Sequence, residues 1–164
     1  MQKQLPLDIR SWKVWLALVS LLAAGTFLPA KIAVTLTPSL KHRVYWLTRV
    51  PSHAHRGDYV LFHDSGHTAR GGLKTTEELM KRVGCDEGDQ LSVDLEKRFY
   101  CNGDYLVTAK ERTIKGEPLQ HFNYNGIVPK GSMFVMGDHR DSYDSRYFGF
   151  VGKDRITATA LPLF

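Results

Sequence analysis

The sequence has little cysteine and no internal repetition. Two cysteines among 164 residues exclude a small scaffold held by many disulfides and a four-cysteine zinc site. The absence of repeats excludes solenoids and propellers. A composition of 43% hydrophobic and 24% charged residues excludes a mostly disordered or collagen-like chain. At this length, one domain with or without a short appendage is expected.

The charge is basic but not patterned for nucleic acid. The chain has 22 Lys and Arg against 17 Asp and Glu, a formal net charge of +5. Because aromatic residues are not interleaved with a basic stripe, we expect no nucleic-acid partner, and the cations are expected to face anionic lipid or solvent. The histidines show no ligand spacing, so neither a metal nor a cofactor is expected, although a metal bound by some of them is an open alternative: His53, His55, His63 and His67.

Apolar residues are concentrated near the N-terminus. Residues 14–30 contain no charged side chain, and Lys13 and Lys31 bound them. About 20 apolar residues span a bilayer, so this stretch predicts a single transmembrane helix within residues 1–33. The cations before it favour a cytoplasmic N-terminus, which places residues 34–164 outside the cytoplasm. A cleaved signal peptide and a buried core helix are the alternatives.

The remaining sequence predicts a mainly β fold, a sandwich or irregular barrel. Short apolar or alternating runs are separated by turn residues. Asn102 and Gly103 predict a tight hairpin, since both tolerate positive φ. Residues 75–80 are the one short helix expected. The expected strands are 33–36, 43–50, 59–63, 79–83, 90–94, 99–101, 105–109, 133–136 and 155–161.

Three segments contain the candidate chemistry: residues 37–45, 80–89 and 135–151. In this order behind an apolar helix, they resemble the signal peptidase I family of membrane-anchored serine–lysine endopeptidases. The resemblance rests on the following stretches: Thr37-Pro38-Ser39, Arg56-Gly57-Asp58-Tyr59-Val60-Leu61-Phe62, Lys81-Arg82-Val83-Gly84 with Gly88-Asp89, and Gly137-Asp138 with Asp144-Ser145-Arg146-Tyr147-Phe148-Gly149.

The resemblance implies a nucleophile at Ser39 and a general base at Lys81. A lysine serves as base only when neutral, and apolar neighbours such as Leu79 and Val83 would lower its pKa. Because Pro38 has no N–H, the oxyanion donors are expected to be the Ser39 amide and the Thr37 hydroxyl. The supporting residues implied are Ser142 to orient the lysine, Asp144 with Arg146 as a bracing pair, and Ser145 as a further contact to the lysine.

The segment after Ser39 departs from the general signal peptidases. The spacing from Thr37-Pro38-Ser39 to Tyr45 and the Gly137-Asp138-His139 stretch are similar instead to TraF-like conjugative-transfer peptidases, although Lys41 and Arg43 stand where those often have Pro and Gly. This implies an inner-membrane enzyme with a periplasmic catalytic domain. Its partners would be a preprotein such as a conjugative pilin precursor, the lipid bilayer, and conjugative secretion components. Cyclisation of the precursor is an alternative to its hydrolysis. Two rivals stay open: a non-catalytic β-module that scaffolds secretion or pilus assembly, and a serine–histidine–aspartate triad using His139.

Two further expectations concern the surroundings of the site. A strand just ahead of Ser39 is expected to bind the substrate by main-chain hydrogen bonds: Ile32, Ala33, Val34, Thr35 and Leu36. Cys85 and Cys101 are expected to form a disulfide between neighbouring strands, as an extracytoplasmic location permits. Two free buried thiols are the alternative.

Overall fold

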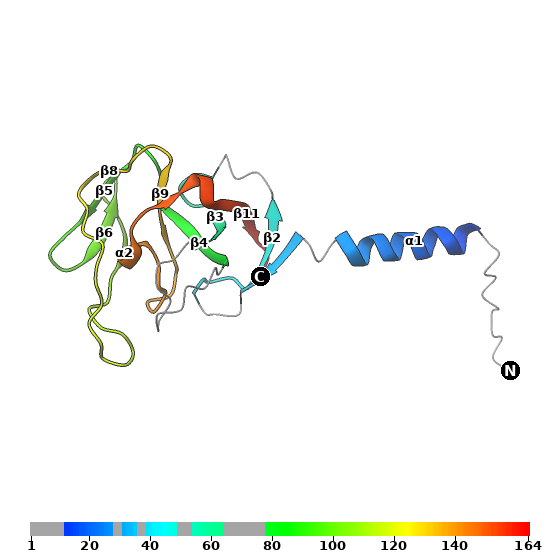
Figure 1. Cartoon of the computed structure of the whole chain (residues 1–164), viewed down its shortest axis with the longest axis horizontal. Coiled ribbons are helices and arrows are strands. Elements are labelled where there is room, and N and C mark those ends of the chain that lie inside the picture. The colour runs from blue at the N-terminus through cyan, green and yellow to red at the C-terminus, as the bar shows by residue number, and fades with distance from the viewer. Residues whose placement is uncertain (1–11, 28–30, 36–38, 49–53, 64–77) are drawn as a thin grey trace.

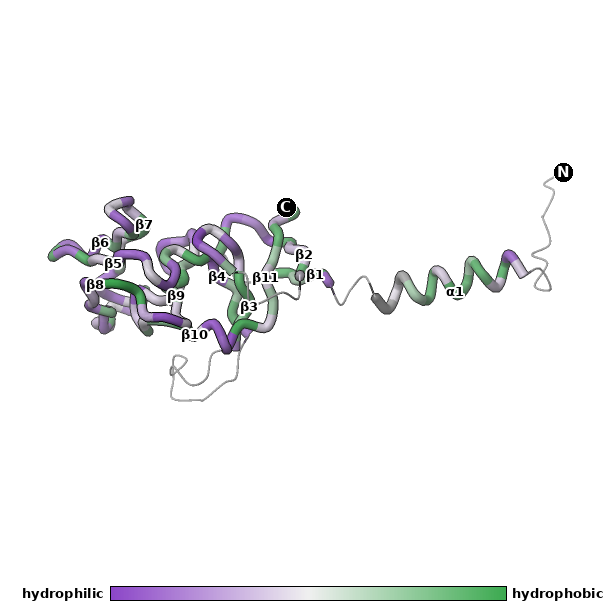
Figure 2. The backbone as a smooth tube through the Cα atoms, turned by 90° about the horizontal axis from the view of Figure 1, so that it is seen from above, coloured by the Kyte–Doolittle hydropathy of each residue, from purple (hydrophilic) through white to green (hydrophobic). Residues whose placement is uncertain are grey.

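The computed structural model describes residues 12–27, 31–35, 39–48, 54–63 and 78–164. The first element is α1 (Trp12–Phe27), which is uncharged after Lys13 and hydrophobic along most of its length (Figure 2). Among the described residues, no helix is both long and apolar enough to cross a bilayer. Residues 28–30, which belong to the predicted span, lie outside the described part.

An antiparallel sheet of seven described strands is the larger part of the fold. Its order is β1-β2-β11-β3-β4-β9-β10, so β1 and β10 are its edges. Figure 1 labels the inner strands β2, β11, β3, β4 and β9. The strands are mostly short, as the frequent turn residues predict, and chain neighbours are often not sheet neighbours. Their bounds are β1 Ile32–Val34, β2 Val44–Thr48, β3 Tyr59–His63, β4 Glu78–Cys85, β9 Ser132–Met136, β10 Val151–Gly152 and β11 Ile156–Pro162.

A second sheet of four strands has the order β7-β6-β5-β8. Its members are β5 (Gln90–Val93), β6 (Arg98–Cys101), β7 (Asp104–Thr108) and β8 (Gly126–Ile127). Asn102 and Gly103 join β6 to β7 with φ of 51° and 87°, so the predicted hairpin is confirmed. These residue types tolerate the left-handed region, which explains why the turn forms there.

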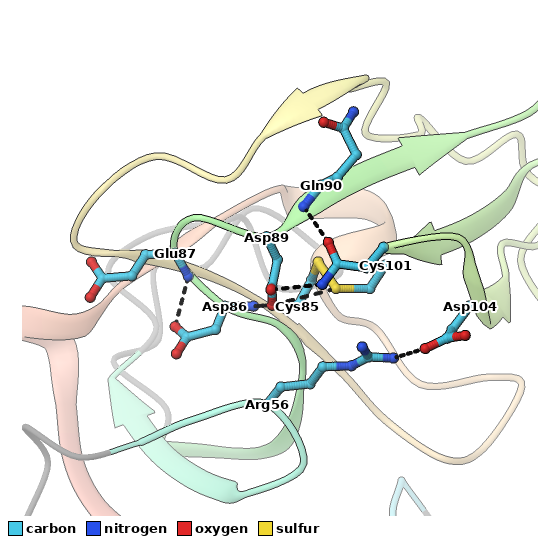
Figure 3. Close-up of a disulfide and its surroundings, with 9 residues drawn as sticks. Arg56, Cys85, Asp86, Glu87, Asp89, Gln90, Cys101 and Asp104 are labelled. Carbon is cyan, nitrogen blue, oxygen red and sulfur yellow. Dashed lines mark hydrogen bonds and ion pairs between the residues drawn. A yellow bond between two sulfur atoms is a disulfide. The ribbon is translucent and has the colours of Figure 1, made fainter.

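The two sheets are packed together through β4 and β9. Phe134 and Met136 of β9 share an apolar cluster with Leu91 and Phe99 of the smaller sheet. A disulfide joins Cys85, the last residue of β4, to Cys101 of β6, which confirms the predicted pairing (Figure 3). The strand that contains Lys81 is therefore covalently linked to the second sheet.

The sequence-based helix at 75–80 is wrong for its described part. Residues 78–80 open β4 as extended strand, because they pair with β3 from Glu78 opposite His63 onward. The pairing to β3 outweighs the local helical preference. Residues 75–77 lie outside the described part. The helix α2 (Ser145–Phe148) and the turn η3 (Lys153–Arg155) were not predicted.

We expect the disulfide to stabilise the domain by about 3 kcal/mol, the chain-entropy value for a loop of this length. The double variant Cys85→Ala/Cys101→Ala should show that loss in the free energy of unfolding measured by urea denaturation. Wild-type protein unfolded under reducing conditions is the control, since it keeps both thiols and loses only the cross-link. Equal stability of reduced and oxidised protein would contradict the expectation.

Candidate active site

Lys81 lies in the middle of β4, directly opposite Val60 of β3. Side chains alternate along a strand, so Lys81 shares its sheet face with Leu79 and Val83. Val60 and Val83 belong to an apolar cluster against which Leu79 packs. Only 4% of Lys81 is exposed. A lysine is thus held against the apolar core of the larger sheet.

The Lys81 amine has a serine as its polar partner. Its Nζ donates to the Ser142 Oγ at 2.8 Å. Burial lowers the pKa of Lys81; the Asp144 carboxylate opposes this effect and the Arg146 guanidinium adds to it. Burial dominates because an ammonium loses its hydration in an apolar site. The neutral amine, which can accept a proton, is therefore favoured relative to a lysine in water.

Gly137 brings Ser39 next to this pair. The Ser39 carbonyl accepts a hydrogen bond from the His139 N–H at 3.1 Å. A Cβ built on Gly137 would lie 2.7 Å from that carbonyl oxygen and 2.1 Å from the Ser142 Oγ. Neither approach is possible for a residue with a side chain, so glycine is required here. Ser39, Ser142 and Lys81 are thereby connected through successive contacts.

A buried ion pair holds the loop that supplies these groups. Asp144 and Arg146 are both 0% exposed, and the guanidinium binds the carboxylate at two points, each 2.7 Å long. Arg146 also donates to the Ser142 carbonyl at 2.9 Å, and Asp144 accepts from the Gly137 N–H at 2.8 Å. The pair therefore fixes the backbone on both sides of the contact between Gly137 and Ser142.

Asp138 links the loop after Ser39 to β4. Its two oxygens accept from the Lys41 N–H at 3.0 Å and from the Arg82 Nε at 3.3 Å. Arg82 follows Lys81 in the chain, so one carboxylate connects the segments of both candidate catalytic residues. Sequence reasoning missed this bridge; the only signal was the Gly137-Asp138 dipeptide.

Tyr45 supports the same loop from inside. It is fully buried, and its hydroxyl donates to the His42 carbonyl at 3.0 Å. Burial raises the pKa of Tyr45 to about 12, and the neighbouring Tyr59 and Asp138 act in the same direction. The phenol therefore keeps its proton and remains a hydrogen-bond donor to the loop. The sequence shows the spacing from Ser39 to Tyr45, but it does not indicate that the Tyr45 hydroxyl supports the loop.

The other predicted site residues have different placements. Ser145 is buried, and its Oγ accepts from the Val135 N–H at 2.9 Å, a bond to the β9 backbone and not the expected contact with Lys81. Ile32, Ala33 and Val34 form the edge strand β1. Thr35 donates its N–H to the Arg43 carbonyl at 2.9 Å. Thr37 and Leu36 lie outside the described residues.

Among the described residues, one group has metal-ligating atoms close together: Cys85, Asp89 and Cys101. Both sulfur atoms are committed to the disulfide, and Asp89 accepts hydrogen bonds from the Asp86 N–H and the Asn102 amide (Figure 3). A disulfide offers no thiolate ligand, so this group is explained without an ion.

The surroundings of Lys81 are those that a general base requires. A buried, partly desolvated amine can accept a proton, and a hydroxyl orients it. The chain matches the family described as signal peptidase, peptidase S26, over residues 9–164. It therefore belongs to the S26 family of signal peptidases.

Two relatives similar in sequence agree with the family match. The chain is 31% identical over 112 residues to a signal peptidase I of Bacillus caldolyticus, a match to 62% of this chain and 56% of the relative. It is 27% identical over 161 residues to the plasmid transfer protein TraF of Escherichia coli, covering 88% and 89%. A signal peptidase I structure from Enterococcus faecalis V583 shows 25% identity and a TM-score of 0.42, with 67% and 96% covered. The chain thus spans about half the length of the Bacillus relative.

We expect Arg146→Leu to lower the free energy of unfolding by about 3–5 kcal/mol, because Asp144 would be left as an uncompensated buried charge. Urea denaturation of the purified domain measures this loss. Arg98→Leu is the matched control, since it breaks a partly exposed pair with Asp94 and should cost much less. Similar losses in the two variants would contradict the bracing role of Arg146.

Proposed function

We propose that this chain is a membrane-anchored serine endopeptidase that removes signal peptides, with Ser39 as nucleophile and Lys81 as general base. The observation that supports it most is the lysine amine: it is buried, has a lowered pKa and is bound by Ser142. Burial disfavours the charged form of a lysine, which is useful for a general base and brings no advantage to a lysine with only a structural role. Family membership agrees with this assignment.

In the proposed reaction, neutral Lys81 takes the proton of the Ser39 hydroxyl as its oxygen attacks the scissile carbonyl. The tetrahedral oxyanion is stabilised by the Ser39 N–H and the Thr37 hydroxyl. Lys81 then gives its proton to the leaving amine, and an acyl ester on Ser39 remains. Water, deprotonated by Lys81, attacks the ester, and Ser39 regains its proton. Ser142 holds the amine in position, while Asp144 and Arg146 hold Ser142.

We assign substrate binding to β1 and the residues that follow it. β1 is an edge of the larger sheet, and among the described strands it pairs with β2 alone. An edge strand can add an extended peptide by main-chain hydrogen bonds. Small residues would be favoured at the first and third positions before the cut, because alternate side chains of a bound strand face the same surface and shallow pockets there would reject bulk.

The anchor and location are part of the same proposal. Residues 14–30 would cross the inner membrane once, with the N-terminus in the cytoplasm and residues 34–164 in the periplasm. The apolar character of α1 supports this, as does Lys31, which lies 5.8 Å from the Trp46 ring centre just beyond the helix. Basic and aromatic residues are typical of a membrane interface. The disulfide fits an oxidising compartment.

A dedicated substrate is the finer part of the proposal. The relative named plasmid transfer protein TraF aligns with nearly the whole chain. This supports a conjugative pilin precursor as substrate, with other conjugative secretion components as partners. An amine of the precursor that replaced water in attacking the acyl ester would yield a cyclic product. A non-catalytic scaffold for secretion or pilus assembly is the rival function.

We expect Ser39→Ala and Lys81→Met each to abolish cleavage, because one lacks the nucleophile and the other the base. Purified full-length protein in detergent, incubated with precursor peptides and followed by mass spectrometry, measures this. Lys115→Met is the control, since Lys115 is an exposed lysine in a turn, and it should keep full activity. Cleavage by either site variant would overturn the assignment; no cleavage by the wild-type protein would favour the scaffold.

A pH profile and two variants separate the lysine from a histidine base. Activity should rise with pH as Lys81 loses its proton, with a midpoint below the ordinary lysine value of about 10.4, because burial lowers its pKa. Lys81→Arg should be almost inactive, since a guanidinium keeps its proton. His139→Ala should retain most activity, because that side chain is exposed. An active Lys81→Arg with an inactive, folded His139→Ala would indicate a triad.

A further inference from the structure

The two loops that meet at Ser39 have exposed basic side chains. Lys41 lies in the first loop and Arg140 in the second, and both are exposed. The carboxylates of the second loop, Asp138 and Asp141, already form ion pairs with Arg82 and Lys110 respectively. Lys41 and Arg140 therefore leave an excess of positive charge on this surface. We call these two side chains the basic rim.

The rim is fixed in position relative to the nucleophile. Lys41 is two residues after Ser39, and its N–H is bonded to Asp138 at 3.0 Å. Arg140 follows His139, whose N–H is bonded to the Ser39 carbonyl at 3.1 Å. Arg43, by contrast, donates its N–H to the carbonyl of Phe164, so its backbone is bonded to the last residue of the sequence and not to the second loop. Backbone hydrogen bonds close to Ser39 therefore fix the chain at Lys41 itself and at His139, the residue before Arg140.

The direction of a bound substrate decides which of its residues reach the rim. This step rests on the proposed function. The apolar segment of a signal peptide and α1 would start in the same bilayer, and β1 follows α1 in the chain. A substrate lying along β1 would then run in the same direction as β1, and its scissile bond would be at Ser39. The residues after the cut would pass beyond Ser39, where Lys41 and Arg140 lie.

We infer that the basic rim selects precursors with acidic residues shortly after the cleavage site. Opposite charges across an interface favour one partner and disfavour a like-charged one, and the effect weakens with salt. An anionic lipid headgroup has similar chemistry. We assign the basic rim to a peptide and not to a lipid, because the rim adjoins Ser39, the residue that would be acylated. Binding of a lipid would not require a position next to Ser39.

Three synthetic peptides test the inference with the full-length protein in neutral detergent. All have Ala at the first and third positions before the cut and at the first position after it. They differ at the second and third positions after the cut, which are Glu-Glu, Gln-Gln or Lys-Lys. At low salt, we expect kcat/KM for the Glu peptide to exceed that for the Gln peptide about tenfold, with the Lys peptide slowest. High salt should shrink the difference to about twofold.

Charge reversal identifies the residues responsible. The double variant Lys41→Glu/Arg140→Glu should prefer the Lys peptide, and Lys115→Glu, an exposed lysine in a turn, should keep the wild-type order. The ratio between peptides is compared within each variant, so a general loss of activity cancels.

Equal cleavage of all three peptides by an active wild-type protein would show that the basic rim does not select substrates. The proposed function would remain intact. A dependence on Lys41 and Arg140 that is present only with vesicles of anionic lipid would assign the rim to lipid and overturn the inference as well. If no peptide is cut, the proposed function is wrong, and the inference about the basic rim, which rests on it, is wrong as well.

Discussion

The ion pair between Asp144 and Arg146 is the interaction on which the site depends. Both side chains are completely buried, so the charge of each is tolerated only because the other is present. Their further hydrogen bonds reach the backbone of the loop at Gly137 and Ser142, and Arg146 also donates to the Thr108 carbonyl of β7. Removing one partner would leave a buried charge and would also release the segment that places the Ser142 hydroxyl beside Lys81. Stability and site geometry are therefore determined by the same contacts.

The ion pair also acts on the lysine through its charges. Asp144 favours the charged form of Lys81 and Arg146 disfavours it, so the two effects oppose each other. Burial on the apolar face of β4 then decides the direction of the shift. A carboxylate without its guanidinium partner would stabilise the ammonium and work against a neutral base. Because the two charges are paired, Asp144 and Arg146 can fix the loop beside Lys81 while burial still lowers the pKa of the lysine.

Sequence reasoning predicted the elements governed by local patterns. The hairpin at Asn102 and Gly103 and the strand at residues 59–63 depend on turn chemistry and on alternation of apolar residues, and both are found. It failed with the helix expected at 75–80, whose described part pairs with β3, whereas the overlapping strand expected at 79–83 is found in β4. It also missed the bridge by Asp138, because Lys41 and Arg82 are far from it in the chain and only the fold brings them together. Ser145 illustrates the same limit, since the resemblance implied a contact with Lys81 and did not indicate its bond to β9.

The bonds that join the two loops depend little on the side chains of the residues that they connect. At residues 41 and 139 these bonds use the backbone N–H, and at Ser39 they use the backbone carbonyl. Only Asp138 contributes a side chain to them, and Gly137 must lack one. The side chains of Lys41, His139 and Arg140 can therefore change without breaking the connection between Ser39 and β4. The candidate site is held by the sheet, the ion pair and backbone bonds, and these exposed side chains take no part in holding it.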